Sequence, residues 1–352
     1  MITTVIPTYR RPRLLARAIR SVLRQGYPDF RVVVYDNASG DETGAVVAEL
    51  AAQDSRLSYR LRPANIGAQA NFIAALGEID TPYYSMLSDD DVLLPYFYEQ
   101  AMASFAIHPE AILVASPVML VNEGGRVLAV NNNGTWAPGL HPAPEAMLRM
   151  AEGEHFIWTG TLFRRAALAS GVMDPETGMC SDLDLLLRIA GRHPIAVAAR
   201  PGAVFSVHPG SPSSYPRLSL YWPSWLKIIA NAGQDPLVPP AVRAAVQASL
   251  ERRLQRLLFL VAVFSSSRGL AGDAAEAAAA FRSRQGSPLR SGLLRVVRFS
   301  CERVPGVRPL LASALTWLRW RRGPVAREQR ILDACPGLLE IDSGSGRQDA
   351  AA

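Results

Sequence analysis

The N-terminal part of the chain alternates short apolar runs with helix-like segments, and this alternation constrains the fold more than any other feature. The apolar runs are rich in β-branched and aromatic residues and have the length of strands. The segments between them place apolar residues three and four positions apart, as one face of a helix requires. The expected strands are 3–7, 30–36, 57–62 and 83–87, and the expected helices are 12–25, 40–53 and 70–79. Such repetition predicts an α/β fold with a mostly parallel sheet flanked by helices.

Polar residues follow three of the expected strands. Residues 8–11 follow the first strand, Asp36 and Asn37 end the second, and residues 89–91 (Asp-Asp-Asp) follow the fourth. The carboxyl ends of parallel strands meet at one edge of a sheet, where ligands bind in folds of this class. Alone, three consecutive carboxylates near a proline are typical of a solvated turn. Beside an acid at the end of a neighbouring strand, they indicate a site for a hard divalent cation.

The composition indicates a globular protein in a reducing compartment. Hydrophobic residues make up 49% of the 352 residues and charged residues 19%, which is enough apolar material for a core. The three cysteines are far apart and odd in number, so we expect no disulfide framework and a cytoplasmic location. We expect no secretory signal and no integral membrane span, because the strongest candidate, residues 257–267, is shorter than the roughly 20 residues required.

The character of the chain changes near residue 221. Before it, expected strands and helices still alternate, at 97–107, 111–120, 156–168, 181–191 and 195–208. Beyond it the strand signal fades and long helices are expected at 240–264 and 307–322. We therefore expect an α/β domain over 1–220, an α-helical, arginine-rich C-terminal region over 221–335, and a disordered tail over 336–352.

The C-terminal region is strongly basic. Twelve arginines lie between Phe281 and Arg330, against the two acids Glu302 and Glu328. A basic amphipathic helix favours peripheral association with a membrane surface. The alternative is a helix packed on the first domain with a solvated basic face. Nucleic acid binding ranks last, because no nucleic-acid motif accompanies the arginines. The expected apolar face of the last helix consists of Leu310, Leu311, Ala314, Leu315 and Leu318.

Five stretches, in their order along the chain, resemble the inverting glycosyltransferases of family 2. They are VIPTYRRPRLLARAIRSVLRQ, VVVYDNASGDET, NIGAQANFIAAL, LSDDDVLLP and SDLDLLLRIAG, between about residues 2 and 210. The resemblance implies a bacterial enzyme whose residues 1–220 form a catalytic domain with the Rossmann-like GT-A fold. It also implies a nucleotide-diphosphate sugar as donor and a divalent metal, Mg²⁺ or Mn²⁺, as cofactor.

The resemblance also implies roles for particular residues. The implied catalytic base is Asp182, and we expect Trp158 and Asp184 near the acceptor. Many family members have other residues at the positions of Arg10, Ala70 and Ser181, which bears on sugar specificity more than on the reaction. The implied metal-binding residues are Asp90, Asp91 and His208. The implied nucleotide-binding residues are Pro7, Thr8, Tyr9, Arg11, Asp36, Asn65, Gly67 and Asp89.

The chemistry of sugar transfer needs these residue types in separate segments. The departing diphosphate gains negative charge, which a divalent cation offsets. Mg²⁺ usually takes only one or two carboxylates besides substrate phosphates, so a short acid cluster suffices. The attacking hydroxyl must lose its proton on the opposite side of the sugar, and Asp182 lies about ninety residues beyond the triplet. Structural alternatives exist for Asp36 as a turn former, for Asp182 and Asp184 as first-turn helix acids, and for His208 and Trp158 as core residues.

The expected function is inverting sugar transfer from a UDP- or dTDP-sugar to a hydroxyl of a saccharide, lipid-linked or other small acceptor. Such a reaction would serve cell-surface polysaccharide or glycoconjugate biosynthesis, in the cytoplasm or at the inner face of the cytoplasmic membrane. One alternative is a sugar-phosphate nucleotidyltransferase, which would carry a glycine-rich loop after the first strand, whereas PTYRRP has no glycine. A non-catalytic nucleotide-sugar-binding protein is the other alternative. It predicts loss of Asp90 or Asp182, and both are present.

Overall fold

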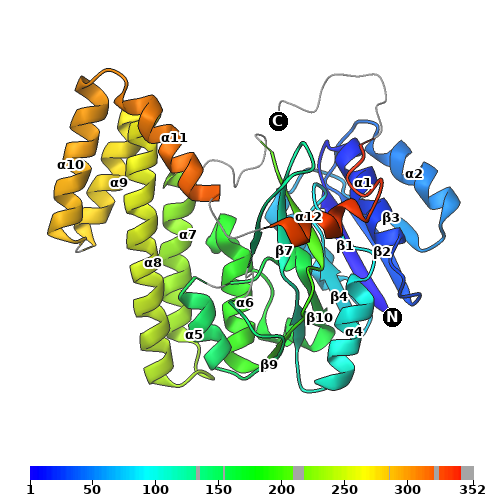
Figure 1. Ribbon diagram of the computed structural model, residues 1–352. Helices are drawn as coiled ribbons and strands as arrows, with labels where there is room; N and C mark the ends of the chain where they lie inside the picture. The colour runs from blue at the N-terminus through cyan, green and yellow to red at the C-terminus, as the bar shows by residue number, and fades with distance from the viewer. Residues whose placement is uncertain (132–134, 154, 209–217, 285, 321–324, 342–352) are drawn as a thin grey trace.

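The structure, a computed structural model, places the expected parallel strands at the centre of one large sheet (Figure 1). It describes residues 1–131, 135–153, 155–208, 218–284, 286–320 and 325–341. The strand order is β3-β2-β1-β4-β10-β6-β11-β9, in which β1 to β4 are parallel and β10 runs antiparallel to both of its neighbours. The bounds are β1 Ile2–Thr8, β2 Phe30–Asp36, β3 Leu57–Leu61, β4 Tyr83–Met86, β6 Leu113–Ala115, β9 Gly139–His141, β10 Thr161–Arg164 and β11 Ile195–Val197.

Alternate residues of the central strands enter two different cores. Ile2 and Ile6 of β1 pack with the apolar faces of α1, α2 and α4. Val5, between them, packs with α3, α5 and α6 on the opposite face of the sheet. Because helices bury both faces, these strands are continuous apolar runs rather than alternating ones. The bounds are α1 Pro12–Leu23, α2 Thr43–Gln53, α3 Ala68–Gly77, α4 Phe97–Ile107, α5 Glu145–Ala151 and α6 Ser181–Arg192, with short 3₁₀ helices η1 Trp158–Gly160, η2 Arg165–Ser170 and η3 Pro175–Cys180.

A second, four-stranded sheet has the order β5-β12-β7-β8. Two apolar runs that the sequence presents as single strands are each divided between the sheets. Residues 111–120 form β6 and β7, and residues 195–208 form β11 and β12. The second break lies at Gly202, where a Cβ atom would be 2.5 Å from Phe97 Cδ2 and 2.7 Å from Ser116 Oγ, so only glycine fits. The bounds are β5 Val92–Leu93, β7 Val118–Asn122, β8 Val127–Asn131 and β12 Ala203–Val207.

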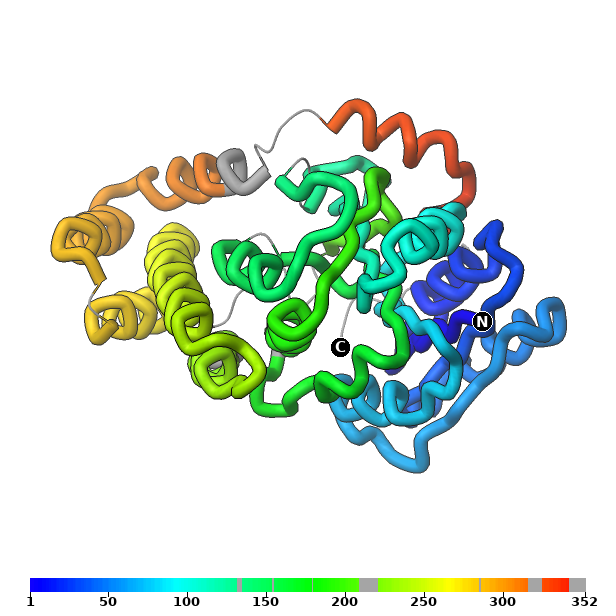
Figure 2. The backbone as a smooth tube through the Cα atoms, turned by 90° about the horizontal axis from the view of Figure 1, so that it is seen from below, coloured from blue at the N-terminus to red at the C-terminus, as the bar shows by residue number. Residues whose placement is uncertain are grey.

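Helices α7 to α11 stand on one side of the α/β part (Figures 1 and 2). Their apolar core is continuous with that of the main sheet, since Ile228 of α7 and Leu254 of α8 belong to the same cluster as Leu186 of α6. No helix among the described residues is long and apolar enough to span a membrane. The bounds are α7 Leu218–Gln234, α8 Pro240–Ser267, α9 Ala271–Ser283, α10 Pro288–Arg303, α11 Val307–Trp320 and α12 Ala326–Asp333.

The last helix, α12, leaves the helical region and returns to the second sheet. Gln329 accepts a hydrogen bond from the backbone of Val127 at 2.9 Å and donates one to the Gly125 carbonyl at 3.2 Å. Leu332 and Leu338 are buried against the second sheet. Residues 336–341 of the expected tail are thus described by the structure, whereas residues 342–352 lie outside the described part of the chain, and the expected tail stays a prediction. The α/β fold class with a mostly parallel sheet and a helical C-terminal region is confirmed.

Candidate active site

The acid triplet lies where the chain passes from the main sheet to the second sheet. β4 ends at Met86, and β5 begins at Val92. Between them, Leu87 still donates its backbone N–H to Val5 of β1 at 3.1 Å. The triplet thus follows the carboxyl end of β4 beside the carboxyl end of β1, which is the edge where folds of this class bind ligands.

Asp89 joins the two strand ends. Its Oδ2 accepts a hydrogen bond from the hydroxyl of Thr8 at 2.7 Å, and its Oδ1 accepts one from Arg11 Nη1 at 3.2 Å. Burial and the negative charge of Asp90 raise the pKa of Asp89 to about 6, although Arg11 and Thr8 oppose the shift. Three residues expected at the nucleotide therefore meet through their own side chains. Pro7, which precedes Thr8 in β1, is buried.

Asp90 is the acid of the triplet that faces a histidine. Its Oδ2 accepts a hydrogen bond from Arg11 Nη1 at 3.0 Å and lies 3.1 Å from His208 Nε2. Burial alone would raise the pKa of Asp90, but the contact with His208 and the charge of Arg11 outweigh burial and lower it. Asp90 is therefore held as a carboxylate beside an imidazole. This oxygen and nitrogen pair suits a divalent cation that also takes phosphate oxygens.

Asp91 is buried and has both of its oxygens engaged. Oδ2 accepts a hydrogen bond from the Thr159 hydroxyl at 2.7 Å, and Oδ1 accepts one from the Ser206 backbone N–H at 2.9 Å. These bonds connect the triplet to η1 and to β12 of the second sheet. Burial, followed by the charge of Asp90, raises the pKa of Asp91 well above its ordinary value. Because both of its oxygens are engaged, the geometry favours a supporting role for Asp91. Direct metal ligation by Asp91 stays a prediction.

Arg17 is a residue of this site that the sequence did not single out. Its Nη2 donates to the backbone carbonyl of Asp90 and, at 2.9 Å, to the Ser206 hydroxyl. Burial lowers the pKa of Arg17, although Asp91 and Asp90 oppose the shift. The guanidinium thus offsets part of the charge of three adjacent acids. Its position on the polar edge of an amphipathic helix gave no signal of this contact.

Asp36 closes the end of β2. Its Oδ1 accepts hydrogen bonds from the backbone and the hydroxyl of Ser39, at 2.9 and 2.6 Å, and its Oδ2 accepts one from the Tyr59 hydroxyl. Ser39 also accepts a hydrogen bond from the backbone of Arg10 at 2.9 Å, which connects this loop to the one after β1. The Arg10 guanidinium lies over the ring of Tyr9, 5.1 Å from its centroid. The bonds to Asp36 fix its orientation, and contact with a base stays a prediction.

Asn65 and Gly67 form the turn before α3. Asn65 Oδ1 accepts hydrogen bonds from Asn37 Nδ2 at 2.8 Å and from the Gly67 N–H at 2.9 Å. Gly67 has a φ of 88°, a left-handed value that favours glycine. Asn37 also accepts a hydrogen bond from the backbone of Ile66 at 2.9 Å. Asn37 therefore ties the expected nucleotide loops after β2 and before α3 to each other.

Asp182 is the second residue of α6, in the first helical turn. Its Oδ1 accepts a hydrogen bond from the Leu183 N–H at 2.8 Å. Burial raises the pKa of Asp182, while that bond and the positive charge of Arg253 on α8 oppose the shift. A raised carboxylate pKa suits proton abstraction near neutral pH. Arg253 was not expected at this site, because one arginine among many on a C-terminal helix carries no distinguishing signal.

The two residues expected near the acceptor lie in different surroundings. Trp158 in η1 is partly buried and packs against Phe72 of α3, with 4.7 Å between the ring centroids and 37° between the ring planes. Asp184 is buried, with Oδ2 bonded to Arg188 Nε and Oδ1 to Asn231 Nδ2, both at 2.9 Å. Its partners give Asp184 a structural role. Contact of either residue with an acceptor stays a prediction.

Comparison with known proteins places this geometry in a family. Residues 3–171 match the sequence model of the family described as Glycosyl transferase family 2. Over 94 residues the chain is 33% identical to GalNAc(5)-diNAcBac-PP-undecaprenol beta-1,3-glucosyltransferase of Campylobacter jejuni, a match covering 26% of this chain and 30% of that protein. Over 90 residues it is 27% identical to Glycosyltransferase GlyA of Streptococcus pneumoniae, covering 26% of this chain and 13% of that protein. The chain thus matches less than a third of the length of either relative.

The fold likeness extends over nearly the whole chain. The structure of S. aureus TarS 1-349 in complex with UDP-GlcNAc superimposes with a TM-score of 0.62 at 16% identity, covering 92% of this chain and 94% of that one. This likeness includes the C-terminal helices, which the family model does not reach. The strand order, the acid triplet after β4 and the matched segment agree: residues 3–171 form a glycosyltransferase family 2 domain, and the chain has the GT-A fold.

Proposed function

We propose that this protein transfers a sugar, with inversion, from a UDP- or dTDP-sugar to a hydroxyl of a saccharide or lipid-linked acceptor in cell-surface polysaccharide biosynthesis. The observation that carries the proposal is the contact of Thr8 and Arg11 with Asp89 and Asp90 at the carboxyl ends of β1 and β4. The name of the Campylobacter relative, a glucosyltransferase for an undecaprenol-linked substrate, supports the acceptor class. The TarS complex with UDP-GlcNAc supports the donor class.

The residues present fit a divalent cation. Asp90 and His208 offer one carboxylate and one imidazole within 3.1 Å of each other. Among the described residues no three histidine, cysteine or acidic side chains converge on one point, so the substrate phosphates would complete the coordination. When bound there, Mg²⁺ or Mn²⁺ supplies positive charge that stabilises the departing diphosphate. Asp91 and Arg17 hold the backbone of the triplet in place for this contact.

The other residues bind the donor and move one proton. The loop from Thr8 to Arg11 lies beside Asp89, and we assign it with Asp36, Asn65 and Gly67 to the nucleotide. Asp182 takes the proton of the attacking hydroxyl as that oxygen bonds to the anomeric carbon. The nucleoside diphosphate leaves from the opposite side of the sugar, which inverts the anomeric centre. Burial, which raises the pKa of Asp182, makes it a better proton acceptor than an exposed aspartate.

A screen of nucleotide sugars tests this assignment. UDP-, dTDP- and GDP-sugars are added with and without Mn²⁺ to the wild type, Asp90→Asn and Asp80→Asn, and both thermal stability and sugar release are measured. We expect one nucleotide to stabilise the wild type in a metal-dependent way, with the response lost in Asp90→Asn. Asp80, an exposed acid paired with Arg31, is the matched control and should behave as wild type. Release of pyrophosphate would support a nucleotidyltransferase instead, and binding without turnover would support a non-catalytic protein.

We also propose peripheral membrane association through the C-terminal helices. Exposed large apolar residues cluster on α10, whereas on α11 Leu310 is exposed but Leu311 and Leu315 pack against the core. The side chains of residues 316–320 lie outside the described part of the chain. Leu289 and Phe299 are 86% and 62% exposed, although both are large apolar residues. The α10 face is defined by Leu289, Leu293, Val296 and Phe299, spaced four, three and three residues apart.

Charge decides which partner this face fits. Arg295 and Arg303 are exposed on the same helix, and the region from Phe281 to Arg330 has twelve arginines and two acids. A second copy docked on the α10 face would bring the same positive charges against these arginines. An anionic lipid surface offers apolar contact and opposite charge together. It would also bring the enzyme to a lipid-linked acceptor.

Vesicle sedimentation tests the α10 face. Wild type should bind vesicles containing phosphatidylglycerol, bind phosphatidylcholine weakly, and be released by salt. The double variant Val296→Ser/Phe299→Ser should lose this binding. Ile107→Ser/Leu237→Ser removes two apolar residues of similar exposure elsewhere and should keep it. Equal binding of both double variants would contradict the assignment. A dimer in solution that only the α10 variant loses would assign the face to a second copy.

A further inference from the structure

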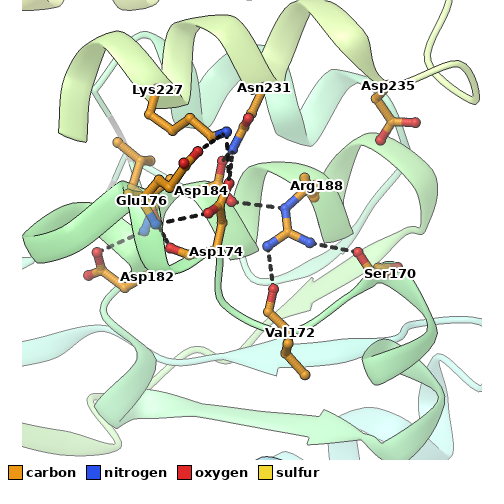
Figure 3. A network of polar contacts seen from close by, with 12 residues as sticks. Ser170, Val172, Asp174, Glu176, Asp182, Asp184, Arg188, Lys227, Asn231 and Asp235 are labelled. Carbon is orange, nitrogen blue, oxygen red and sulfur yellow. Dashed lines mark hydrogen bonds and ion pairs between the residues drawn. The ribbon is translucent and has the colours of Figure 1, made fainter. Parts of the chain in front are cut away.

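Helix α7 contacts residues 174–184, the segment that carries Asp182, through side-chain hydrogen bonds and an ion pair. Asp182 lies between η3 and the second turn of α6, and helix α7 runs along this segment (Figure 3). Asn231 Nδ2 donates to Asp174 Oδ2 at 3.0 Å and to Asp184 Oδ1 at 2.9 Å. Both hydrogens of one amide group are thus used on carboxylates that precede and follow Asp182 in the chain. This closes a loop around the proposed base.

Lys227, one turn earlier on α7, adds to the same contact. Its Nζ is paired with Glu176 and lies 3.6 Å from Asp174 Oδ2. Asn231 and Lys227, together with their partners Asp174, Glu176 and Asp184, form what we call the α7 clamp (Figure 3). The pairs of Lys227 are partly exposed and contribute little stability by themselves. Their effect is on the geometry of the segment.

The clamped segment has little regular structure of its own. η3 is interrupted at Gly178, which has φ 47° and ψ −125°. A Cβ atom at Gly178 would lie 2.7 Å from Ser224 Oγ of α7, so the helix packs directly on this backbone. A short irregular segment of this kind does not fix the position of the residues that follow it. The contacts with α7 supply that constraint.

Asp174 also connects the clamp to the donor side of the site. Its backbone carbonyl accepts a hydrogen bond from Gln69 Nε2 at 2.9 Å. Gln69 is the second residue of α3, which begins directly after Gly67 of the expected nucleotide loop. One residue therefore contacts both α3 and α7. Asp174 therefore fixes the distance between the donor loop and the segment that carries Asp182.

We infer that the α7 clamp positions Asp182 against the bound donor, so that Asn231 and Lys227 of the C-terminal region act as positioning residues for catalysis. The inference rests on the proposed function, in which Asp182 is the base. It gives the C-terminal helices a part in the reaction that is separate from membrane association. Displacement of a reacting group by about 1 Å can lower a rate by roughly a hundredfold. Loss of the clamp should therefore reduce kcat far more than donor binding.

The test compares Asn231→Leu with a matched control. Gln247→Leu removes another side-chain amide that bonds to α7, here the Ile229 carbonyl at 2.9 Å, but it does not touch the Asp182 segment. Each variant is assayed for turnover of the nucleotide sugar identified by the screen, for affinity by calorimetry, and for amide hydrogen exchange. Asn231→Leu should lower kcat about 10- to 100-fold. Donor affinity should stay within about twofold, and exchange should rise in residues 174–184. Gln247→Leu should keep kcat within about twofold of wild type.

Lys227 provides a second variant series should Asn231→Leu fold poorly. Lys227→Met should lower kcat, and Lys227→Arg, which keeps the positive charge, should restore most of it. Equal loss of kcat in Asn231→Leu and Gln247→Leu would overturn the inference, because the effect would then be general. Unchanged kcat in Asn231→Leu beside an inactive Asp182→Asn would overturn the clamp alone. Full activity of Asp182→Asn would overturn the base assignment and the clamp with it.

Discussion

Thr159 donates its hydroxyl hydrogen to Asp91 Oδ2 at 2.7 Å, a buried bond between residues 68 positions apart. This bond ties η1 to the acid triplet. Removing the hydroxyl would leave a buried carboxylate oxygen without one of its partners, which costs about 1–3 kcal/mol or more for a charged group. We therefore expect Thr159→Val to lower the free energy of unfolding by roughly that amount, measured by urea denaturation.

Thr43→Val is the matched control for that substitution. The Thr43 hydroxyl is buried and has no hydrogen-bond partner among the described residues. Replacing it with a methyl group should leave stability unchanged or raise it slightly, because no bond is lost. Similar losses of stability in Thr43→Val and Thr159→Val would contradict the importance of the Thr159 bond.

The pH dependence of turnover should report the charge of Arg253. Burial raises the pKa of Asp182, and the positive charge of Arg253 limits the rise by favouring the carboxylate. As the proposed base, Asp182 must be deprotonated, so kcat/KM should fall as pH drops through this raised pKa. Arg253→Met removes the positive charge, raises the pKa further, and should move the acidic limb of the profile to higher pH.

Arg252→Met controls for loss of an arginine from the same helix. Arg252 donates to Ser249 at 2.8 Å, one turn back on α8. Its profile should keep the wild-type acidic limb. If the acidic limb of the Arg253→Met profile moves to lower pH, the prediction that Arg253 lowers the pKa of Asp182 is wrong.

Stability should also depend on the protonation of His155. The Arg253 guanidinium lies 2.9 Å from His155 Nδ1, and burial together with this charge lowers the pKa of His155 to about 3. The unfolded chain takes up the proton below its ordinary value of about 6.5, whereas the folded chain does not until about 3. The folded state therefore has its full stability with respect to His155 above about pH 6.5. As pH falls below that value, protonation of His155 in the unfolded chain lowers the free energy of unfolding.

Urea denaturation at pH 7 and pH 5 measures this effect. The histidine keeps part of its surface exposed, so we expect wild type to lose about 1 kcal/mol more than His155→Gln between these values. Glutamine can still accept the hydrogen bond but does not titrate. His108→Gln, which removes an imidazole elsewhere, serves as the control. Equal losses in wild type and His155→Gln would contradict the prediction.

The sequence predicts the centre of the main sheet well, because local patterns determine it. Ile2 and Ile6 on one face and Val5 on the other are an apolar run that only a strand buried on both faces explains. Residues 111–120 show the limit of such patterns. They form one apolar run, yet Ser116 and Pro117 carry the chain from the main sheet to the second. That change depends on contacts with β12, which lies far along the chain.

The site residues also divide into those that local sequence patterns predict and those that depend on tertiary contacts. The triplet and Asp36 could be placed at one edge because strand ends mark it. Arg17, Asn231 and Arg253 could not, since each is a polar residue of an ordinary helix whose partner lies in a distant segment. Their roles come from tertiary contacts, which spacing along the sequence does not encode.

The pairing of β12 has a consequence for how this enzyme can vary. Ser206 of β12 donates its backbone N–H to Asp91, and His208, the residue directly after the strand, lies beside Asp90. Two residues at a spacing of two therefore contact the triplet from β12 and its end. Shifting a strand by one residue turns every side chain to the opposite face. A single-residue insertion within Ala203–Val207 should therefore remove both contacts at once, whereas an insertion in the turn before Ala203 should leave them intact. We therefore expect changes in length in the turn before Ala203 rather than within the strand.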